Sequence, residues 1–133
     1  MAYITSYIAA LLTFVVADIA WLGVMSSRLY KPTLGDILLD RFSVLPAAVF
    51  YLLYPIGLVI FAIAPALRGG NLLTAVQMGA LFGLFTYGTY DLTNQATLRS
   101  WTTSLTIVDV AWGTVLGAMT AASAYWVTTR FVA

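Results

Sequence analysis

The chain has 133 residues, of which 62% are hydrophobic and only 8% are charged, with a net charge of +1 and a mean hydropathy of +0.94. Soluble domains carry about 25% charged residues, so this composition indicates an integral membrane protein. The small net charge and the lack of a basic cluster argue against a nucleic-acid partner. Cysteine, histidine and glutamate are missing from the sequence, which excludes thiolate and imidazole metal sites and thiol or imidazole catalysis. We therefore expect no catalytic residue, no metal and no cofactor.

Four apolar segments are each long enough to cross a bilayer, which takes about 20 residues. We predict transmembrane helices over residues 3–25, 45–67, 72–92 and 104–127. The first segment lacks the basic start of a signal peptide and is longer than its apolar core, so we interpret it as a retained helix. The sequence predicts an all-α membrane protein, in which residues 1–133 form a single domain, a bundle of four transmembrane helices.

The connections between these segments suggest an orientation. Four basic residues fall in the first and third connections and two on the opposite side, which places the first and third connections in the cytoplasm by the positive-inside rule. In the first connection, residues 37–42 (Ile-Leu-Leu-Asp-Arg-Phe) could form a short interfacial helix. Pro55 interrupts the second predicted helix and predicts a kink near its middle.

The third and fourth predicted helices each carry a repeat of small residues, Gly79-x-x-x-Gly83 and Gly113-x-x-x-Gly117. Glycines spaced in this way let two helices approach closely in a membrane. The simpler interpretation is that these neighbouring helices pack on each other. The alternative is that one repeat forms the interface of a homodimer.

Three aspartates lie inside the apolar segments: Asp18, Asp91 and Asp109. A carboxylate at membrane depth costs at least about 2.5 kcal/mol and faces the protein interior or a water-filled cavity, which makes each one a candidate for function. The directions of the helices put all three in the half of the bundle nearer the first and third connections. Arg28 and Arg99 lie on that side, with Arg41 in the same connection as Arg28, and could reach down to neutralise the carboxylates.

We expect the polar stripes of three helices to meet in one interior seam, in which Asp91 shares a face with Gln77 and Asp109 shares one with Gly113. The string Asp-x-Ala-Trp occurs twice, at Asp18 to Trp21 and at Asp109 to Trp112, and each indole could donate to its own aspartate. The candidate ligand-binding residues are Asp18, Asp91, Asp109, Trp21, Trp112, Asn94, Gln77 and Tyr90.

Two interpretations of the aspartates stay open. They could line a hydrophilic pocket or a proton-responsive site, or each could cap a helix, pair with an arginine or accept a buried hydrogen bond with a purely structural role. An intramembrane aspartyl protease is disfavoured, because no Gly-x-Gly-Asp string follows the pair Tyr90-Asp91. The aromatic stripe of Phe50, Tyr51 and Tyr54 is more typical of packing or lipid contact than of a pigment or quinone site.

The string Tyr90-Asp-Leu-Thr-Asn-Gln-Ala-Thr-Leu98, followed downstream by Asp109-x-Ala-Trp-Gly113, resembles the predicted bacterial membrane proteins grouped as the domain of unknown function 2177 family. The likeness extends over nearly the whole chain. It implies four helices and the bacterial inner membrane, and it brings no activity, substrate or cofactor.

We expect the protein to bind or carry a small or lipid-like ligand through the seam, with a possible link to protons and possible dimerisation. The alternative is a non-catalytic accessory or scaffold subunit that packs against a larger membrane complex through its glycine faces and aromatic stripe. A lipid-modifying enzyme ranks third, because the chemistry would rest on aspartates alone. Membrane lipids are the one partner that every alternative requires.

Overall fold

The computed structural model describes residues 1–132 and contains four helical spans with no strand among these residues. The spans are Ala2–Leu34, Val44–Gly69, Leu72–Thr97 and Thr103–Phe131, each long and apolar enough to cross a membrane. The prediction of four transmembrane helices is confirmed, although every span is longer than predicted. The chain is therefore a multi-pass membrane protein.

The first two spans are not regular along their whole length. The first consists of α1 (Ala2–Met25), a π-helical turn η1 (Ser26–Tyr30) and the short helix α2 (Lys31–Leu34). The second consists of α3 (Val44–Leu58), a π-helical turn η2 (Val59–Ile63) and α4 (Ala64–Gly69). The second irregularity precedes a proline: Pro65, in the first turn of α4, has no N–H to donate to the carbonyl of Phe61, which lies in the π-helical turn. Pro55 lies inside α3, which continues three residues beyond it.

The last two spans are single helices, α5 (Leu72–Thr97) and α6 (Thr103–Phe131). The side chain of Asn71 caps α5 by accepting from the backbone N–H of Thr74 at 3.0 Å, and Thr102 caps α6 by accepting from the N–H of Leu105 at 3.1 Å. These caps satisfy N–H groups that a helix start leaves without a partner. They fix where the two long helices begin.

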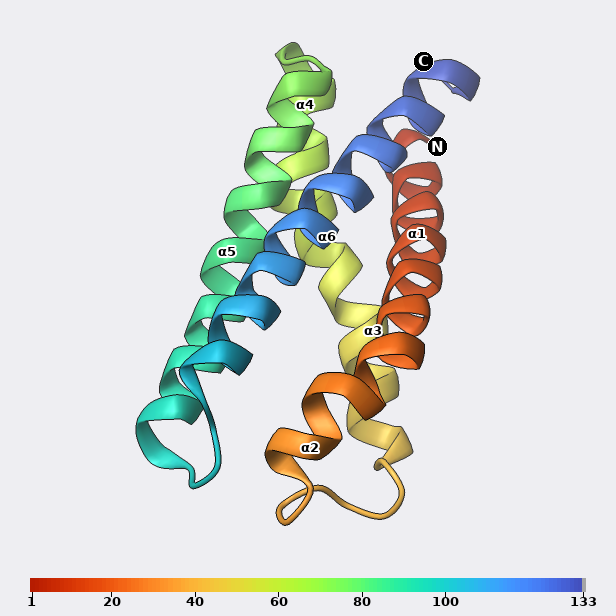
Figure 1. Ribbon diagram of the computed structural model, residues 1–133. Coiled ribbons are helices and arrows are strands. Elements are labelled where there is room, and N and C mark those ends of the chain that lie inside the picture. The colour runs from red at the N-terminus through yellow and green to blue at the C-terminus, as the bar shows by residue number, and fades with distance from the viewer. Residues whose placement is uncertain (133) are drawn as a thin grey trace.

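The expected helix over residues 37–42 is wrong. The chain between α2 and α3 is non-helical over residues 35–43, and the extra helical turns lie before it, in η1 and α2. Because the first span continues as a helix to Leu34, only this segment is left to reach the start of α3, and it does so in a looped conformation visible at the bottom of Figure 1.

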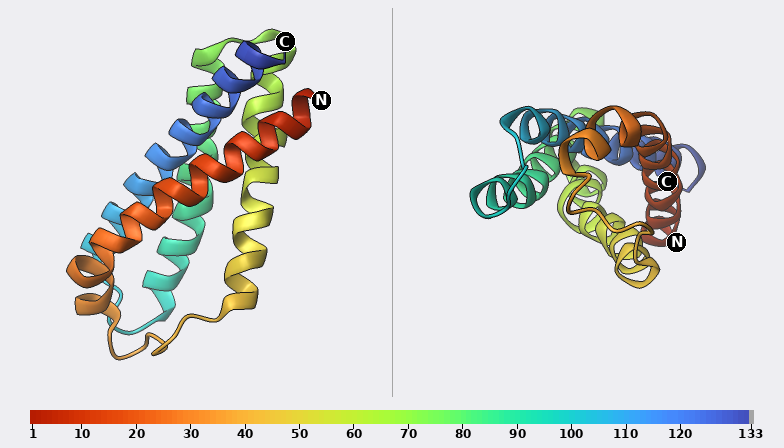
Figure 2. Two further views of the ribbon diagram at one scale, coloured as in Figure 1. Left: turned by 90° about the vertical axis from the view of Figure 1, so that its right-hand side faces the viewer. Right: turned by 60° about the horizontal axis from the view of Figure 1, so that its bottom comes forward.

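The helices form a bundle in which α6 packs between α5 and α1, while α3 packs on α1 and η2 packs on α5. Figure 1 shows both termini and the α4–α5 turn at one end of the bundle, with the other two connections at the opposite end. The two views in Figure 2 show the same arrangement from the side and towards the lower end. We call the end that carries the first and third connections the loop end.

The glycine repeats form the contact between α5 and α6, as the simpler interpretation predicts. A Cβ atom on Gly83 would overlap the backbone carbonyl of Gly113, and a Cβ atom on Gly79 would overlap that of Gly117. Both repeats are therefore occupied within one chain, which leaves neither of them free as the interface of a homodimer.

Candidate functional site

Asp18 lies on α1, at the middle of the first span, and is 7% exposed. Its carboxyl oxygens accept two hydrogen bonds from other elements: Tyr51 on α3 donates its hydroxyl at 2.5 Å, and Trp112 on α6 donates its indole N–H at 3.1 Å. Hydrogen bonds to a carboxylate are among the stronger ones in proteins. Asp18 therefore ties three helices together at one buried point.

Asp109 lies on α6 and is 6% exposed. Its Oδ1 accepts the hydroxyl of Tyr30, which belongs to the π-helical turn η1. The oxygen of Tyr30 in turn accepts the indole N–H of Trp21 at 2.9 Å. Trp21, Tyr30 and Asp109 thus form a chain of donors that ends on the carboxylate.

The two Asp-x-Ala-Trp strings are cross-paired. Trp112 donates to Asp18 on the other helix, and Trp21 reaches Asp109 through Tyr30. The expectation that each indole serves its own aspartate is therefore wrong. The Asp and Trp of each string are three residues apart, so they lie on the same face of their helix. In the structure this face of α1 packs against the same face of α6. Each indole N–H therefore points toward the aspartate of the other helix.

The indole rings of the two strings also touch each other. The rings of Trp21 and Trp112 are stacked with centroids 4.4 Å apart and planes 3° from parallel. Together with the hydrogen bonds, this stack closes the cluster of Asp18, Asp109, Tyr30, Tyr51, Trp21 and Trp112, which we call the aspartate–aromatic cluster.

Asp91 lies on α5 and is completely buried. Neither of its carboxyl oxygens has a hydrogen-bond donor within reach. The α5–α6 contact pairs Gly79 with Gly117 and Gly83 with Gly113, and continuing this antiparallel register by two turns brings Asp91 level with Leu105, one turn from Asp109. The carboxyl group of Asp109 accordingly lies beside that of Asp91.

The structure therefore brings the three aspartates together in the half of the bundle at the loop end, as the helix directions predict. The arginines of that end do not neutralise them. Arg28, Arg41 and Arg99 are exposed, and the donors to Asp18 and Asp109 are aromatic side chains.

The other candidate residues lie farther out. Tyr90 is 56% exposed and meets the ring of Trp101 edge-on at 5.5 Å. Asn94 is half-buried one turn farther along α5. Gln77 is exposed near the start of α5, about four turns from Asp91, so the structure does not bring it to the aspartates.

The buried polar side chains do not form one continuous seam along the bundle, because large apolar side chains separate the aspartates from Thr120, Thr128 and Ser6, which are also completely buried. Phe14, one turn before Asp18 on α1, is completely buried, as is Leu116, two turns after Asp109 on α6. Beyond them, the next buried polar contact is the 2.8 Å hydrogen bond between Ser6 and Thr128 near the termini.

Two open grooves lie on the surface of α6. One of about 340 Å³ borders the stacked indoles. It is lined by Trp21, Ile107, Val108, Ala111, Trp112 and Val115. We call it the indole groove, and two of its lining residues, Trp21 and Trp112, belong to the aspartate–aromatic cluster.

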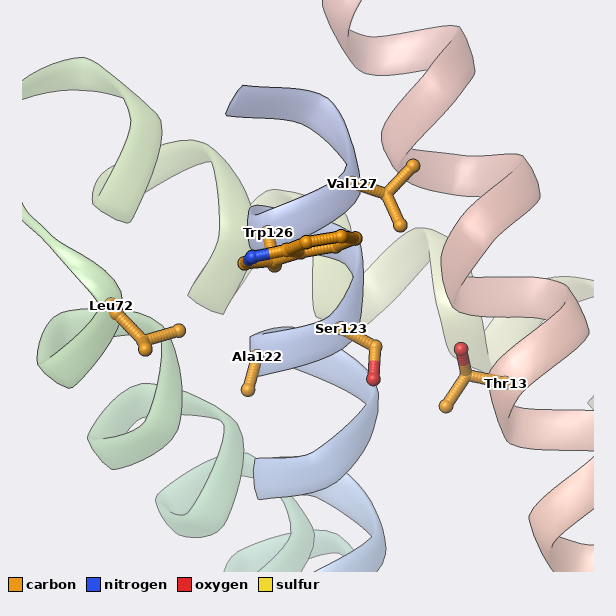
Figure 3. Close-up of a pocket in the computed structure, with 6 residues that line it drawn as sticks. All are labelled: Thr13, Leu72, Ala122, Ser123, Trp126 and Val127. Atoms are coloured by element: carbon orange, nitrogen blue, oxygen red, sulfur yellow. The ribbon is translucent and has the colours of Figure 1, made fainter. Parts of the chain in front are cut away.

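The second groove, of about 510 Å³, lies toward the termini and is shown in Figure 3. Its lining residues come from α1, α5 and α6, and the hydroxyls of Thr13 and Ser123 are its small polar side chains. It contains none of the candidate residues, and its polar groups are hydroxyls instead of carboxylates.

Tyr30 and Tyr51, the hydroxyl donors of the cluster, are not among the site residues predicted from the sequence. Tyr30 falls in the segment that we interpreted as a connection, and Tyr51 in the stripe that we assigned to packing. A usable signal was present for Tyr51: a tyrosine in an apolar span needs an acceptor for its hydroxyl, and carboxylates were the strongest acceptors available.

Comparison with known proteins gives one match. A family model described as "Predicted membrane protein (DUF2177)" matches residues 3–126. No curated protein and no solved structure matches the chain.

Proposed function

Since the chain belongs to the DUF2177 family of predicted membrane proteins, we propose a function inside the bilayer: it binds a small, lipid-like ligand at the indole groove and the aspartate–aromatic cluster. The proposal includes a place in the bacterial inner membrane, with the loop end facing the cytoplasm. Neither the family description nor the fold indicates a ligand. We therefore infer the kind of ligand from the residues that line the groove and from their hydrogen bonds.

One observation carries the proposal. The side chains that line the apolar indole groove, Trp21 and Trp112, are the same ones whose N–H groups lead to buried carboxylates. A binding site for a small molecule is usually an apolar concavity with a few convergent polar groups. Here the indole rings of Trp21 and Trp112 form part of the apolar lining, and the N–H groups of the same two rings donate the hydrogen bonds that lead to the carboxylates.

The chemistry of the site selects the kind of ligand. Its lining is apolar and faces the membrane, which suits a hydrocarbon tail. Behind the indoles lie acceptors, Asp18 and Asp109, and their donors are neutral hydroxyl and indole groups. A cationic or hydroxyl head group could replace such a donor, whereas an anionic head group would be repelled by the carboxylates.

The extent of the polar cluster favours binding over passage through the bundle. Phe14 and Leu116 are completely buried between the cluster and the termini, and a path across the membrane would need them to move. The accessory role has less support, because the glycine faces on which it would depend are filled by the contact between α5 and α6.

A thermal-shift experiment with three matched amphiphiles tests the proposal. Purified protein in a mild maltoside detergent is titrated with dodecylamine, dodecanol and dodecanoate, which share a tail and differ in head-group charge. We expect dodecylamine to raise the melting temperature most and dodecanoate least.

The expected preference should disappear in Asp18→Asn, which keeps the shape of the side chain and removes its charge. Ser123→Ala, which changes the groove of Figure 3, is the matched control and should keep the preference. Equal shifts with all three amphiphiles, or an amine preference that persists in Asp18→Asn, would overturn the proposal.

A further inference from the structure

Asp91 is the buried carboxyl side chain that the ligand proposal does not use. It is completely buried on α5 toward the loop end, level with Leu105 of α6, and both of its oxygens lack a donor among residues 1–132. Leaving a buried ionised carboxylate without a partner costs far more than leaving a neutral group unpaired. The resting state of this side chain therefore needs a partner that the present hydrogen bonds do not supply.

The groups around Asp91 show what that partner is. On its own helix it is flanked by Tyr90, and Tyr87 lies one turn earlier. From α6 it faces the carboxyl group of Asp109, from η1 the hydroxyl of Tyr30 is already donated to Asp109, and from α1 the nearest titratable group of the cluster is Asp18. The arginines of the loop end are exposed and do not reach its oxygens.

A metal ion does not fit this arrangement. A hard cation such as Ca²⁺ takes six to eight oxygen ligands, and the described residues hold no group of three or more histidine, cysteine, aspartate or glutamate side chains placed to bind a metal. A proton needs only two oxygens, one to carry it and one to accept it.

We infer that Asp91 and Asp109 form a proton-binding site, in which Asp91 carries the proton and donates it in a hydrogen bond to Asp109. Adjacent carboxyl groups that are shielded from water share a proton in this way, because like charges at short range cannot both persist. The inference goes beyond the ligand proposal and holds whether or not the indole groove is occupied.

The hydrogen bonds of the cluster decide which carboxyl group carries the proton. Asp109 already accepts the hydroxyl of Tyr30, whose oxygen accepts from Trp21, and a carboxyl group that receives a donor is favoured in its ionised form. Asp91 receives none. With the proton on Asp91, the carboxyl groups of both residues have a partner, and the donors of Tyr30 and Asp91 both point toward Asp109.

The arrangement predicts a specific dependence of stability on pH. The unfolded chain exposes Asp91 to water, where an aspartate is ionised at neutral pH, so the folded protein binds a proton that the unfolded chain does not. Stability must then fall as the pH rises and the folded protein loses that proton. Asp91→Asn should remove this part of the dependence, because its amide N–H can donate to Asp109 without titrating.

Infrared spectroscopy of the wild type, without added amphiphile, tests the site directly. A protonated carboxyl group has a C=O stretch separate from that of carboxylates, and labelling the aspartate side chains with ¹³C assigns the band to aspartate. We expect such a band at pH 7 in the wild type, its loss at high pH together with a lower melting temperature, and its loss at pH 7 in Asp91→Asn.

Asp40→Asn is the matched control, because Asp40 is an exposed aspartate of the loop, and this variant should keep the band. In Asp109→Asn the band should remain at a shifted frequency, because the acceptor of the hydrogen bond has changed. Absence of the band in the wild type at pH 7 would overturn the site, a result that does not depend on the folding of any variant. A band that survives in Asp91→Asn would place the proton on another aspartate and overturn the assignment.

Discussion

The indole N–H of Trp112 on α6 donates to the carboxylate of Asp18 on α1, 94 residues away in the sequence. The hydrogen bond lies partly buried in the half of the bundle at the loop end. It joins the first and last helices of the chain, so its loss should be felt by the whole bundle and not by one helix.

Trp112→Phe should lower the free energy of unfolding by about 1–2 kcal/mol, because it removes one donor from Asp18 while it keeps an aromatic ring in the stack with Trp21. Denaturation of the purified protein by increasing SDS in mixed micelles measures the change. Trp126→Phe is the matched control, since Trp126 is 55% exposed. Equal losses in both variants would contradict a special role for the bond to Asp18.

Tyr30→Phe and Trp21→Phe should show strongly non-additive effects on stability. Trp21 reaches Asp109 only through the hydroxyl of Tyr30, so once that hydroxyl is removed, the further loss of the indole N–H should cost little. A double-mutant cycle, measured by the same SDS denaturation, should give a coupling of about 0.5–3 kcal/mol. Additive losses would mean that the two residues act separately.

Gly83→Ala should destabilise the protein by about 1–3 kcal/mol, because its new methyl group would overlap the carbonyl of Gly113 and force α5 and α6 apart. Gly88→Ala on the same helix is the control: nothing lies within 4 Å of its added Cβ atom. That variant should be neutral or gain up to about 1 kcal/mol from higher helix propensity. Melting temperatures that respond alike to both substitutions would argue against the close contact.

The two ends of the bundle should be accessible from opposite sides of the membrane. The chain has no cysteine of its own, so single-cysteine variants can be labelled without background. Asp40→Cys and Leu98→Cys should react together with a membrane-impermeant maleimide from one side, and Gly69→Cys and Val132→Cys from the other. The positive-inside rule further predicts that the first pair faces the cytoplasm; labelling of that pair in intact spheroplasts would contradict this orientation.

The elements that the sequence predicts well are those governed by one helix at a time. Apolar length identifies four spans, and helix direction places Asp18, Asp91 and Asp109 at the same end. The contact between the glycine repeats could be predicted for a related reason. Two consecutive helices are antiparallel neighbours, so a row of glycines on one is expected to pack on the row of glycines on the other.

The partners of the aspartates were beyond the reach of the same reasoning. A helical wheel shows which residues share a face, but it does not show which residue of another helix fills the space opposite. Arg28 and Arg99 were the obvious candidates by charge, yet their side chains remain exposed at the loop end. Tyr51, which lay in an apparently apolar stripe, supplies the donor instead.

Local geometry also decided the position of Tyr30. A regular α-helix ending near Met25 would have left it in a loop, whereas the structure continues the helix through η1 to Leu34. Helix propensity does not predict a π-helical turn. The contribution of Tyr30 to the cluster could therefore be found only from the structure.

The π-helical turn at Ser26–Tyr30 makes the length of this segment matter as much as its composition. A π-helical turn holds one residue more than an α-helical turn, so it rotates everything after it by about 100° relative to a regular helix. If the same five residues adopted regular α-helical phase, the hydroxyl of Tyr30 would turn away from Asp109, whereas deleting one residue between Ser26 and Leu29 would remove the extra residue and leave the tyrosine on about the same face. A variant that kept its length but formed a regular helix here would need a new donor for that carboxylate, even though the tyrosine itself would still be present.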